Sequence, residues 1–423
     1  MSELSYLEKL MDGVEVEWLP LSKVFNLRNG YTPSKTKKEF WANGDIPWFR
    51  MDDIRENGRI LGNSLQKISS CAVKGGKLFP ENSILISTSA TIGEHALITV
   101  PHLANQRFTC LALKESYADC FDIKFLFYYC FSLAEWCRKN TTMSSFASVD
   151  MDGFKKFLIP RPCPDNPEKS LAIQSEIVRI LDKFTALTAE LTAELNMRKK
   201  QYNYYRDQLL SFDDEQEKPI YLEKLLDGVE VEWLPLGEVS ALRRGRVMSK
   251  GYLTENFGPY PVYSSQTANN GKIGSINTFD FDGEYISWTT DGANAGTVFY
   301  RTGKFSITNV CSLITLKNKY PLIYKFLFYW LTIEAKKHVY SGMGNPKLMS
   351  HQVENIPVPV PCPDNPEKSL AIQSEIVRIL DKFDTLTNSI TEGLPREIEL
   401  RQKQYEYYRD LLFSFPKPET VSN

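Results

Sequence analysis

Internal repetition constrains this 423-residue chain more than any other feature. Three pairs of segments match, and they are 162–184 with 361–383, 6–21 with 221–236, and 198–212 with 401–415. The first pair, PCPDNPEKSLAIQSEIVRILDKF, agrees at all 23 positions, and the second differs only at Met11 against Leu226. The segments between them share far less. This alternation predicts two exchangeable modules on one fixed frame, a layout that suits an adaptor reading two different things at a set separation.

The repeats also predict where the parts of the chain begin and end, because a chain of this length suggests two or more domains. We expect an N-terminal part of the frame, a first variable module, a central frame region with a spacer helix, a second variable module and a C-terminal frame helix. In that order the predicted ranges are 1–21, 22–161, 162–236, 237–360 and 361–423.

Composition is that of a globular protein, with 42% hydrophobic and 24% charged residues. The longest apolar stretch, FLFYYCFSLAEWC at 125–137, is far shorter than the roughly 20 residues of a membrane span. The first residues, MSELSYLEKL, lack the pattern of a signal peptide. The eight cysteines form no CxxC pair, so we interpret them as reduced thiols of a cytoplasmic protein with no zinc site.

Charge is distributed unevenly between modules and frame, although the net formal charge is −2. Residues 22–160 and residues 237–360 each carry a net charge of +5, so the remaining, repeated residues carry −12. Basic modules on an acidic frame favour a polyanion such as DNA as the ligand of the modules. Chance is the alternative for an excess of this size.

A long helix is predicted after each PCPDNPEKS segment. Asn166 and Asn365 are candidate N-caps, and the prolines that follow them suit a first helical turn. Mostly apolar residues then recur every three or four positions, from Ile173 to Phe212 and from Ile372 to Phe415, with Arg198 and Arg401 also in the series. A spacing kept for this long is typical of a coiled coil, so we expect the two helices to pair as an antiparallel rod.

The two predicted helices differ at their middle. The first contains the word TAEL twice, and the spacer residues Thr188, Leu191, Thr192 and Leu195 mark the ends of the two copies. Four residues lengthen a helix by about 6 Å and form a stutter in the heptad pattern. The second helix has Gly393 and Pro395 in this zone, so we expect a kink or break there. If the helix separates two DNA readers, its length sets the gap between the two sites; tandem slippage in a solvated helix is the alternative.

Each module is a mixture of short strands and glycine turns that closes with an aromatic helix. The stretches 81–93 and 279–300 read as strands ended by glycine turns. The closing helices share the word KFLFY, at 124–128 and 325–329, which indicates that the modules are divergent copies of one fold. We interpret its aromatic stripe as core and not as a base-stacking platform.

These words together resemble the DNA-specificity subunits of type I restriction-modification systems. The words that carry the resemblance are NGYTPSK at 29–35, GDIPWFRMDDI at 44–54, ISTSATIGEHALI at 86–98, GPYPVYSSQTANNGKIGSI at 258–276, TTDGANAG at 289–296, and the proline-rich entries that end at Gln174 and Gln373. The family's usual acidic pair before that glutamine is absent, because Ala172 and Ile173 precede Gln174. Strict repetition with a tandem TAEL looks most like the type IC group.

The resemblance implies an α/β fold with two globular target recognition domains, separated by two long antiparallel coiled-coil helices in a pseudo-two-fold internal repeat. It implies a non-catalytic subunit of a methyltransferase and endonuclease complex, in which each recognition domain reads one half of an asymmetric, bipartite sequence in double-stranded DNA. The helices would set the spacing and dock two methyltransferase (M) subunits, and motor-nuclease (R) subunits would join that core. S-adenosylmethionine, ATP and Mg²⁺ would be bound by those partners and not by this chain. No membrane is involved.

Candidate DNA contacts follow from base chemistry, because Arg and Lys suit guanine, Asn and Gln suit adenine, and turns expose such side chains. In the first module the candidates are Arg28, Asn29, Tyr31, Lys35, Arg50, Ser87, Thr91, Asn105, Gln106 and Arg107. In the second they are Arg243, Arg244, Arg246, Tyr263, Ser265, Gln266, Asn294, Asn309, Asn345 and Lys347. Each of them reads a base, contacts a phosphate or is a structural polar group. Further phosphate candidates are Lys37, Lys38, Lys336 and Lys337.

Two other functions stay open at this point. The first is a scaffold without DNA, in which the modules bind proteins and the coiled coil is a dimerisation rod. The second is an enzyme, which the sequence disfavours because it has no NPPY-type methylation motif, no Gly-rich cofactor loop and no GxxxxGK[ST]. The four histidines have no partner at ligand spacing, so we predict no metal site.

Overall fold

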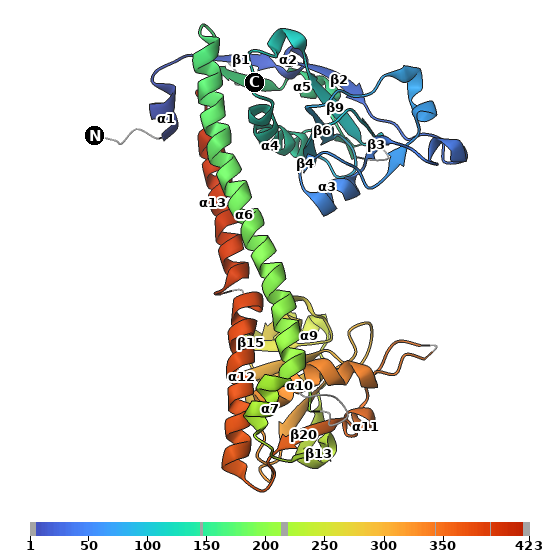
Figure 1. Cartoon of the computed structure of the whole chain (residues 1–423), viewed down its shortest axis with the longest axis vertical. Helices are drawn as coiled ribbons and strands as arrows, with labels where there is room; N and C mark the ends of the chain where they lie inside the picture. Colours follow the sequence, from blue (N-terminus) through green and yellow to red (C-terminus); the bar gives the residue numbers. More distant parts are fainter. Residues whose placement is uncertain (1–5, 144–146, 213–218, 343, 390, 418–423) are drawn as a thin grey trace. The chain divides into compact units, whose positions relative to one another are not determined.

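A computed structural model describes residues 6–143, 147–212, 219–342, 344–389 and 391–417 (Figure 1). The chain divides into two compact units. Unit 1 comprises residues 1–190 together with 399–423, and unit 2 comprises residues 191–398. Both combine helices with mixed sheets, and helix α6 (Pro167–Leu209) begins in unit 1 and ends in unit 2. No helix of the described residues has the length and apolar character that crossing a membrane requires.

Unit 1 is built on a five-stranded sheet in the order β2-β9-β6-β7-β4, with a three-stranded sheet β5-β3-β8 beside it. Its strands are β1 (Val16–Pro20), β2 (Phe25–Asn29), β3 (Ile46–Phe49), β4 (Ile60–Leu61), β5 (Lys67–Ile68), β6 (Ser83–Ser87), β7 (His95–Ile98), β8 (Leu103–Ala104), β9 (Phe108–Leu113), β10 (Thr141–Met143), β11 (Ala147–Val149) and β12 (Leu158–Pro162). Its other helices are α1 (Tyr6–Met11), α2 (Leu21–Val24), α3 (Met51–Asn57), α4 (Ile123–Lys139) and α5 (Met151–Lys156).

The central strand of this sheet is covered on both faces. Every residue of β6 is buried, and its odd and even positions enter different clusters. Ile84 and Ile86 pack with Phe125 of α4, while Leu85 packs with Trp48 and Phe108. A strand buried on both sides reads as a continuous apolar run instead of an alternating one. The predicted strand within 81–93 and the predicted core role of the aromatic closing helix are therefore confirmed.

Unit 2 contains a six-stranded sheet in the order β14-β19-β17-β18-β15-β16. Its strands are β13 (Val231–Pro235), β14 (Ser240–Arg244), β15 (Phe257–Tyr263), β16 (Lys272–Ile276), β17 (Phe281–Thr289), β18 (Val298–Ile307), β19 (Cys311–Leu316) and β20 (Pro357–Pro361). Its helices are α7 (Ile220–Leu226), α8 (Leu236–Val239), α9 (Lys250–Glu255), α10 (Tyr324–Glu334), α11 (Ser350–Val353) and α12 (Pro366–Asn388), with α13 (Leu394–Leu412) beginning here and ending in unit 1. The strands predicted within 279–300 are β17 and the start of β18.

The repeated words build the same local structure in each unit. In unit 1, β1 pairs antiparallel with β12, and in unit 2, β13 pairs antiparallel with β20 in the same register. Asn166 Oδ1 accepts a hydrogen bond from the Lys169 amide at 3.0 Å, and Asn365 Oδ1 accepts one from the Lys368 amide at 3.1 Å. Both predicted N-caps are confirmed, and each satisfies an otherwise unpaired amide of the first helical turn.

The first repeat packs beside the C-terminal helix. Leu7 and Met11 of α1 enter the same core cluster as Leu412 of α13. The indole Nε1 of Trp18 donates to the Pro416 carbonyl at 3.0 Å. The N-terminal and C-terminal parts of the frame therefore form one structure within unit 1.

The long helices have a wider apolar face than a coiled-coil seam. In unit 1, Ile173, Ile177 and Leu181 of α6 are buried in the module core beside α4, whereas Phe184 stacks on Tyr408 of α13 with ring centroids 5.4 Å apart. Ile173, Ile177 and Leu181 are spaced four residues apart, which places them on a second apolar face of α6. A strict coiled-coil seam has only the a and d positions and lacks such a face. This part of α6 therefore packs on the module, whereas Phe184 pairs with the other long helix.

Unit 2 repeats this arrangement with the two copies exchanged. Here Phe383 of α12 stacks on Tyr205 of α6, again with centroids 5.4 Å apart, and Figure 1 shows the two helices side by side. Along the seam at the first TAEL word the packing is loose, because Leu187 keeps 37% of its surface exposed. The predicted interruption of the second helix is confirmed: α12 ends at Asn388, and α13 begins at Leu394 after Gly393, whose φ is +81°.

A polar clamp joins frame and module in unit 1. Gln174 of α6 is fully buried, and its Nε2 donates to the Cys120 carbonyl at 2.9 Å. Further along α6, Asp182 accepts a hydrogen bond from the Tyr128 hydroxyl at 2.7 Å and forms an ion pair with Lys124 at 2.7 Å. Burial, more than the neighbouring carboxylate, raises the pKa of Tyr128 well above its usual range, so this hydroxyl stays a donor.

The same clamp occurs in unit 2. Gln373 Nε2 donates to the Pro321 carbonyl at 2.6 Å, while Asp381 accepts from the Tyr329 hydroxyl at 2.6 Å and pairs with Lys325 at 2.7 Å. The tyrosine and lysine belong to the KFLFY word of the module, and the glutamine and aspartate belong to the identical frame repeat. Two otherwise divergent modules are therefore held by one set of contacts.

Candidate nucleic-acid interface

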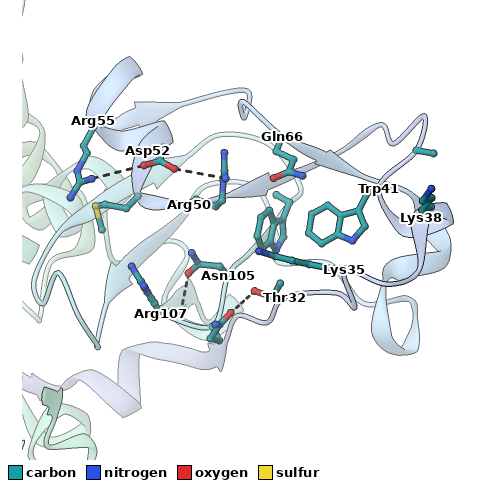
Figure 2. A pocket seen from close by; sticks show the side chains of 14 residues that line it. Thr32, Lys35, Lys38, Trp41, Arg50, Asp52, Arg55, Gln66, Asn105 and Arg107 are labelled. Atoms are coloured by element: carbon teal, nitrogen blue, oxygen red, sulfur yellow. Dashed lines mark hydrogen bonds and ion pairs between the residues drawn. The ribbon is translucent and has the colours of Figure 1, made fainter. Parts of the chain in front are cut away.

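Unit 1 has a cleft of about 740 Å³ next to the end of β3 (Figure 2). The described side chains that line it include five cations, which are Lys35, Lys38, Arg50, Arg55 and Arg107, and a single carboxylate, Asp52. Polar groups for hydrogen bonding come from Thr32, Gln66, Asn105 and Gln106. A concave, strongly basic surface with amide groups suits a phosphate backbone and base edges.

Asp53 fixes the floor of the cleft. Its side chain is fully buried and accepts from the Arg50 amide and from the Leu65 amide, both at 2.6 Å. These hydrogen bonds fix the backbone turn between β3 and α3, and they thereby place Arg50 at the cleft. Asp52, the next residue back, is half exposed and lies 3.8 Å from Arg50 and 3.9 Å from Arg55. Figure 2 shows this carboxylate between the two guanidinium groups.

Two tryptophans form the wall. Trp41 and Trp48 meet edge to face with centroids 5.0 Å apart, and the Trp48 indole donates to the Tyr31 carbonyl at 3.0 Å. Arg50 lies over the Trp48 ring at 5.9 Å. Rigid aromatic walls restrict the cations beside them, which lowers the entropy lost on binding.

The opposite wall is the turn that follows β8. Asn105 Oδ1 accepts from the Arg107 amide at 3.0 Å, which shapes the turn and points Arg107 outward. Thr32 hydrogen-bonds the side chain of Gln106. The structure thus brings together Lys35, Arg50, Asn105, Gln106 and Arg107 from the ten candidates predicted in this module.

Unit 2 has a matching strand arrangement at the end of β15. In unit 1 the end of β3 runs parallel to β8 and the Asn105 amide donates to the Phe49 carbonyl at 3.1 Å; in unit 2 the end of β15 runs parallel to β18 and the Thr308 amide donates to the Tyr263 carbonyl at 2.9 Å. A glycine precedes each site because a Cβ would lie 2.1 Å from the Asn105 carbonyl oxygen at Gly30 and 2.4 Å from the Thr308 carbonyl oxygen at Gly245. Arg50 of the cleft therefore corresponds to the start of the loop that follows Tyr263.

Five predicted candidates of unit 1 lie outside the cleft. Arg28 donates to the Leu78 and Lys77 carbonyls, Asn29 accepts from Thr109, and Tyr31 bonds Ala72 and Lys74. Ser87 is completely buried and bonds the Ser89 carbonyl. The Thr91 hydroxyl is buried among the described atoms without a partner. These contacts stabilise the module, and burial removes Ser87 from any surface that a ligand reaches.

The candidates of unit 2 are scattered by comparison. Those with structural partners are Arg243 over Phe281, Arg244 on the Asn309 carbonyl, Arg246 on Asp280, Tyr263 under Arg301, Gln266 on the Lys272 carbonyl, and Asn294 on the Ser265 carbonyl. Asn345 and Lys347 are exposed, and the Lys347 amide donates to the Tyr340 carbonyl at 3.0 Å. The loop after Tyr263 thus contains Ser265 and Gln266 but none of the arginines.

Sequence reasoning missed Arg55, Asp52 and Gln66 of the first cleft. Asp52 and Arg55 lie on α3 and Gln66 lies in the connection between β4 and β5, whereas the predicted candidates were chosen mostly from turns and loops. The spacing Arg50 to Arg55 after a tryptophan, FRMDDIR, was the available signal.

Buried histidines in unit 1 are structural. His95 is fully buried, and desolvation first, then the Arg59 charge, lowers its pKa to about 3. Desolvation lowers the pKa of His102 to about 4. Within the described ranges no cluster of three ligating side chains has the geometry to hold a metal ion. All eight cysteines are free thiols.

The frame presents one cluster of tyrosine, glutamate and arginine twice, outside the basic cleft. In unit 2, Tyr221 is half exposed and its hydroxyl donates to Glu375 at 3.0 Å, while Arg378 bonds the same carboxylate at 2.6 Å. The Arg378 guanidinium lowers the pKa of Glu375 to about 2. A cleft of about 750 Å³ lies beside it, between α6, α7 and α12, with Ile220 72% exposed.

Unit 1 carries the same polar constellation. The Tyr6 hydroxyl donates to Glu176 at 2.8 Å, and Arg179 bonds that carboxylate at 2.6 Å. Tyr407 and Tyr408 of α13 are exposed here as Tyr204 and Tyr205 are in unit 2. Aromatic side chains that remain exposed in this number are typical of protein interfaces.

The comparisons with known proteins agree with this architecture. A model for the type I restriction modification DNA specificity domain matches residues 13–198 and 228–400. The type I restriction enzyme EcoprrI specificity subunit of Escherichia coli is 65% identical over 396 residues, which cover 93% of both chains, and the EcoR124I/EcoR124II specificity subunit of the same species is 39% identical over the full length of both. The S subunit from M. genitalium has the same fold, with a TM-score of 0.53 and 17% identity over 96% of this chain and 98% of that one. These relatives do not favour the scaffold without DNA. This chain belongs to the family of type I restriction-modification DNA specificity subunits.

Proposed function

We propose that this chain is the non-catalytic specificity subunit of a methylating and restricting complex, in which each module reads one half of a bipartite, asymmetric DNA target. The observation that carries the proposal is the cleft with five cations at the end of β3, together with the matching strand arrangement at the end of β15. Because the residues at the two sites differ, the two half-sites differ in sequence. The complex works on DNA, which places it in the cytoplasm.

Contacts divide between phosphates and bases. Lys35, Lys38 and Arg55 are exposed and reach outward, so we assign them to phosphates, which supply position and salt-dependent affinity. Asn105, Gln106 and Arg107 stand on a turn shaped by hydrogen bonds, and we assign them to base edges. Exposed Lys336 and the turn with Asn345 and Lys347 are further candidates in unit 2.

Two methyltransferase (M) subunits dock on the frame. Support comes from the duplicated surface at Tyr6 and Tyr221, because two copies of one surface bind two copies of one partner. Motor-nuclease (R) subunits join that core, and S-adenosylmethionine, ATP and Mg²⁺ belong to those partners. The spacer residues Thr188, Leu191, Thr192 and Leu195 set the gap between half-sites through the length of α6.

Methylation-aware sequencing tests the proposal. A host lacking its own systems expresses this chain with a compatible M subunit, beside a host that expresses the M subunit alone. We expect a new methylated motif in two fixed halves with a constant gap. An assembled complex that adds no chain-dependent methylation would overturn the assignment. Salt provides a second check, because DNA affinity falls steeply with ionic strength while a protein interface responds much less.

A further inference from the structure

The loop of residues 264–271 occupies the place in unit 2 that the basic cleft occupies in unit 1. It joins β15 to β16, and the Ser264 amide donates to the Gly271 carbonyl at 2.8 Å to close its base. The match through Phe49 and Tyr263 puts this loop at the start of the second site. Residues 264–271 include no Lys or Arg, so this loop offers carboxamides and hydroxyls where the first cleft offers cations.

Two asparagines form the tip of the loop. Asn269 has φ 50° and ψ 40°, and Asn270 has φ 51° and ψ 33°, so both adopt the left-handed conformation. Asparagine is, after glycine, the residue that tolerates this conformation best. Residues 267–270 are all exposed, whereas Gly271, with φ +81°, is buried. The backbone therefore presents two adjacent carboxamides to the solvent.

A buried arginine supports the loop from below. Arg301 is 5% exposed, and its guanidinium lies over the Tyr263 ring at 3.6 Å and over Phe299 at 4.5 Å. Its Nε donates to the Ser287 hydroxyl at 3.0 Å. Desolvation lowers the pKa of Arg301 to about 10, so the group is still charged at neutral pH. Across the described ranges, no carboxylate comes within ion-pair distance of it.

Burying a cation without an ion-pair partner is costly, and the two aromatic faces and the Ser287 hydroxyl offset part of that cost. The guanidinium lies directly against the base of the loop, since a Cβ at Gly271 would meet Arg301 Nη2 at 3.2 Å. Two further bonds complete the support: Thr308 Oγ1 to Ser264 Oγ at 2.8 Å, and Asn294 Nδ2 to the Ser265 carbonyl at 2.9 Å. The loop is thereby fixed at its base on both sides.

We propose that Asn269 and Asn270 determine the second half-site by reading adenine in the major groove, and that Arg301 is the positioning residue of this loop. A carboxamide donates to adenine N7 and accepts from adenine N6 as a matched pair, a pattern that phosphates do not offer. Arg301 itself is too buried to reach DNA. This inference rests on the proposed function, because it names the chemistry of that same site.

The test uses the full chain assembled with its M subunits and the sequencing assay above. Asn269→Gly and Asn270→Gly remove the carboxamides while keeping a residue that adopts the left-handed backbone. Asn270→Asp keeps only acceptors, which suits cytosine N4. Asn318→Gly, exposed on the turn after β19, is the matched control. Arg301→Lys keeps the charge and removes the planar stack.

The glycine variants should lower discrimination for adenine in the second half-site by roughly tenfold or more, with the first half-site and the gap unchanged. Asn270→Asp should shift preference towards cytosine, and Arg301→Lys should relax the same half-site while the melting temperature of the complex stays near that of the parent. If the parent complex methylates a bipartite motif and a chain with both Asn269→Gly and Asn270→Gly methylates it with equal base preference, the inference is overturned while the proposed function stands. If the parent writes no motif, the proposed function itself fails.

Discussion

Deletion of Thr192–Leu195 should shorten the gap in the methylated motif and leave both half-sites unchanged. These four residues lie inside the continuous helix α6, so their removal shortens the helix without opening it. The repeat makes the deletion locally neutral. Glu194 pairs with Arg198 at 2.6 Å, and after the deletion Glu190 takes the same place four residues before that arginine.

The magnitude follows from helix geometry. Four residues at about 1.5 Å each remove about 6 Å and rotate the following part of the helix by about 40°. One base-pair step is about 3.4 Å, so the gap should shrink by one or two base pairs. Stability should change by less than about 0.5 kcal/mol, because the lost ion pair is replaced and exposed pairs of this kind contribute little.

Methylation-aware sequencing of hosts expressing the parent or the deletion, each with the same M subunit, measures the gap directly. Replacement of Thr192–Leu195 by four alanines is the control, since it changes the side chains and preserves the length. An unchanged gap in the deletion, or a changed gap in the alanine control, would refute the reasoning that α6 length sets the spacing.

Four further predictions concern the clamp, the cleft, the histidines and the frame surface. Asp182→Asn and Asp381→Asn each remove a charged acceptor from a buried tyrosine, and each should lower the free energy of unfolding by about 1–2 kcal/mol in denaturant titrations; no loss would contradict the clamp. Lys35→Ala with Lys38→Ala should reduce the slope of log affinity against log salt by about 2, and an unchanged slope would exclude phosphate contacts by this pair. His95 and His102 have folded pKa values below the unfolded value near 6.5, so the unfolded state takes up protons first as the pH falls. The free energy of unfolding should therefore be highest above pH 6.5 and should fall below it by up to about 1.4 kcal/mol per pH unit for each histidine. His102→Leu should reduce that slope in melting curves recorded across this pH range. Ile220→Asp should weaken binding of an M subunit at unit 2, while Ile60→Asp, exposed in the first module, should not, as sedimentation of the mixture will report.

Local features of the fold were predictable because they depend on short-range rules. The caps at Asn166 and Asn365, the break near Gly393 and the strands between glycines all follow from residues close in sequence. The side on which Ile177 and Leu181 are buried was not predictable, since it depends on α4, about 50 residues away. A periodic apolar stripe predicts that a helix has a buried face, but it does not identify the element that packs against that face.

The candidate site was predicted in part for a related reason. Residue type and turn position identified Arg50, Asn105 and Arg107, which the fold brings to one cleft. Residue type also selected Arg28 and Ser87, whose hydrogen bonds lie inside the module. An arginine that binds a ligand and an arginine that bonds two carbonyls look alike in a sequence, and only tertiary contacts separate them.

The duplicated clamp has a consequence for how such a chain changes over generations. Gln174 and Asp182 hold the first module by the same bonds with which Gln373 and Asp381 hold the second, so the anchoring points are independent of what each module reads. Substitutions at a reading surface leave the anchor intact, and a change in one module leaves the other untouched. One half of the recognised sequence can therefore change while the other half is inherited unaltered, and a changed module still makes the anchoring contacts with the frame.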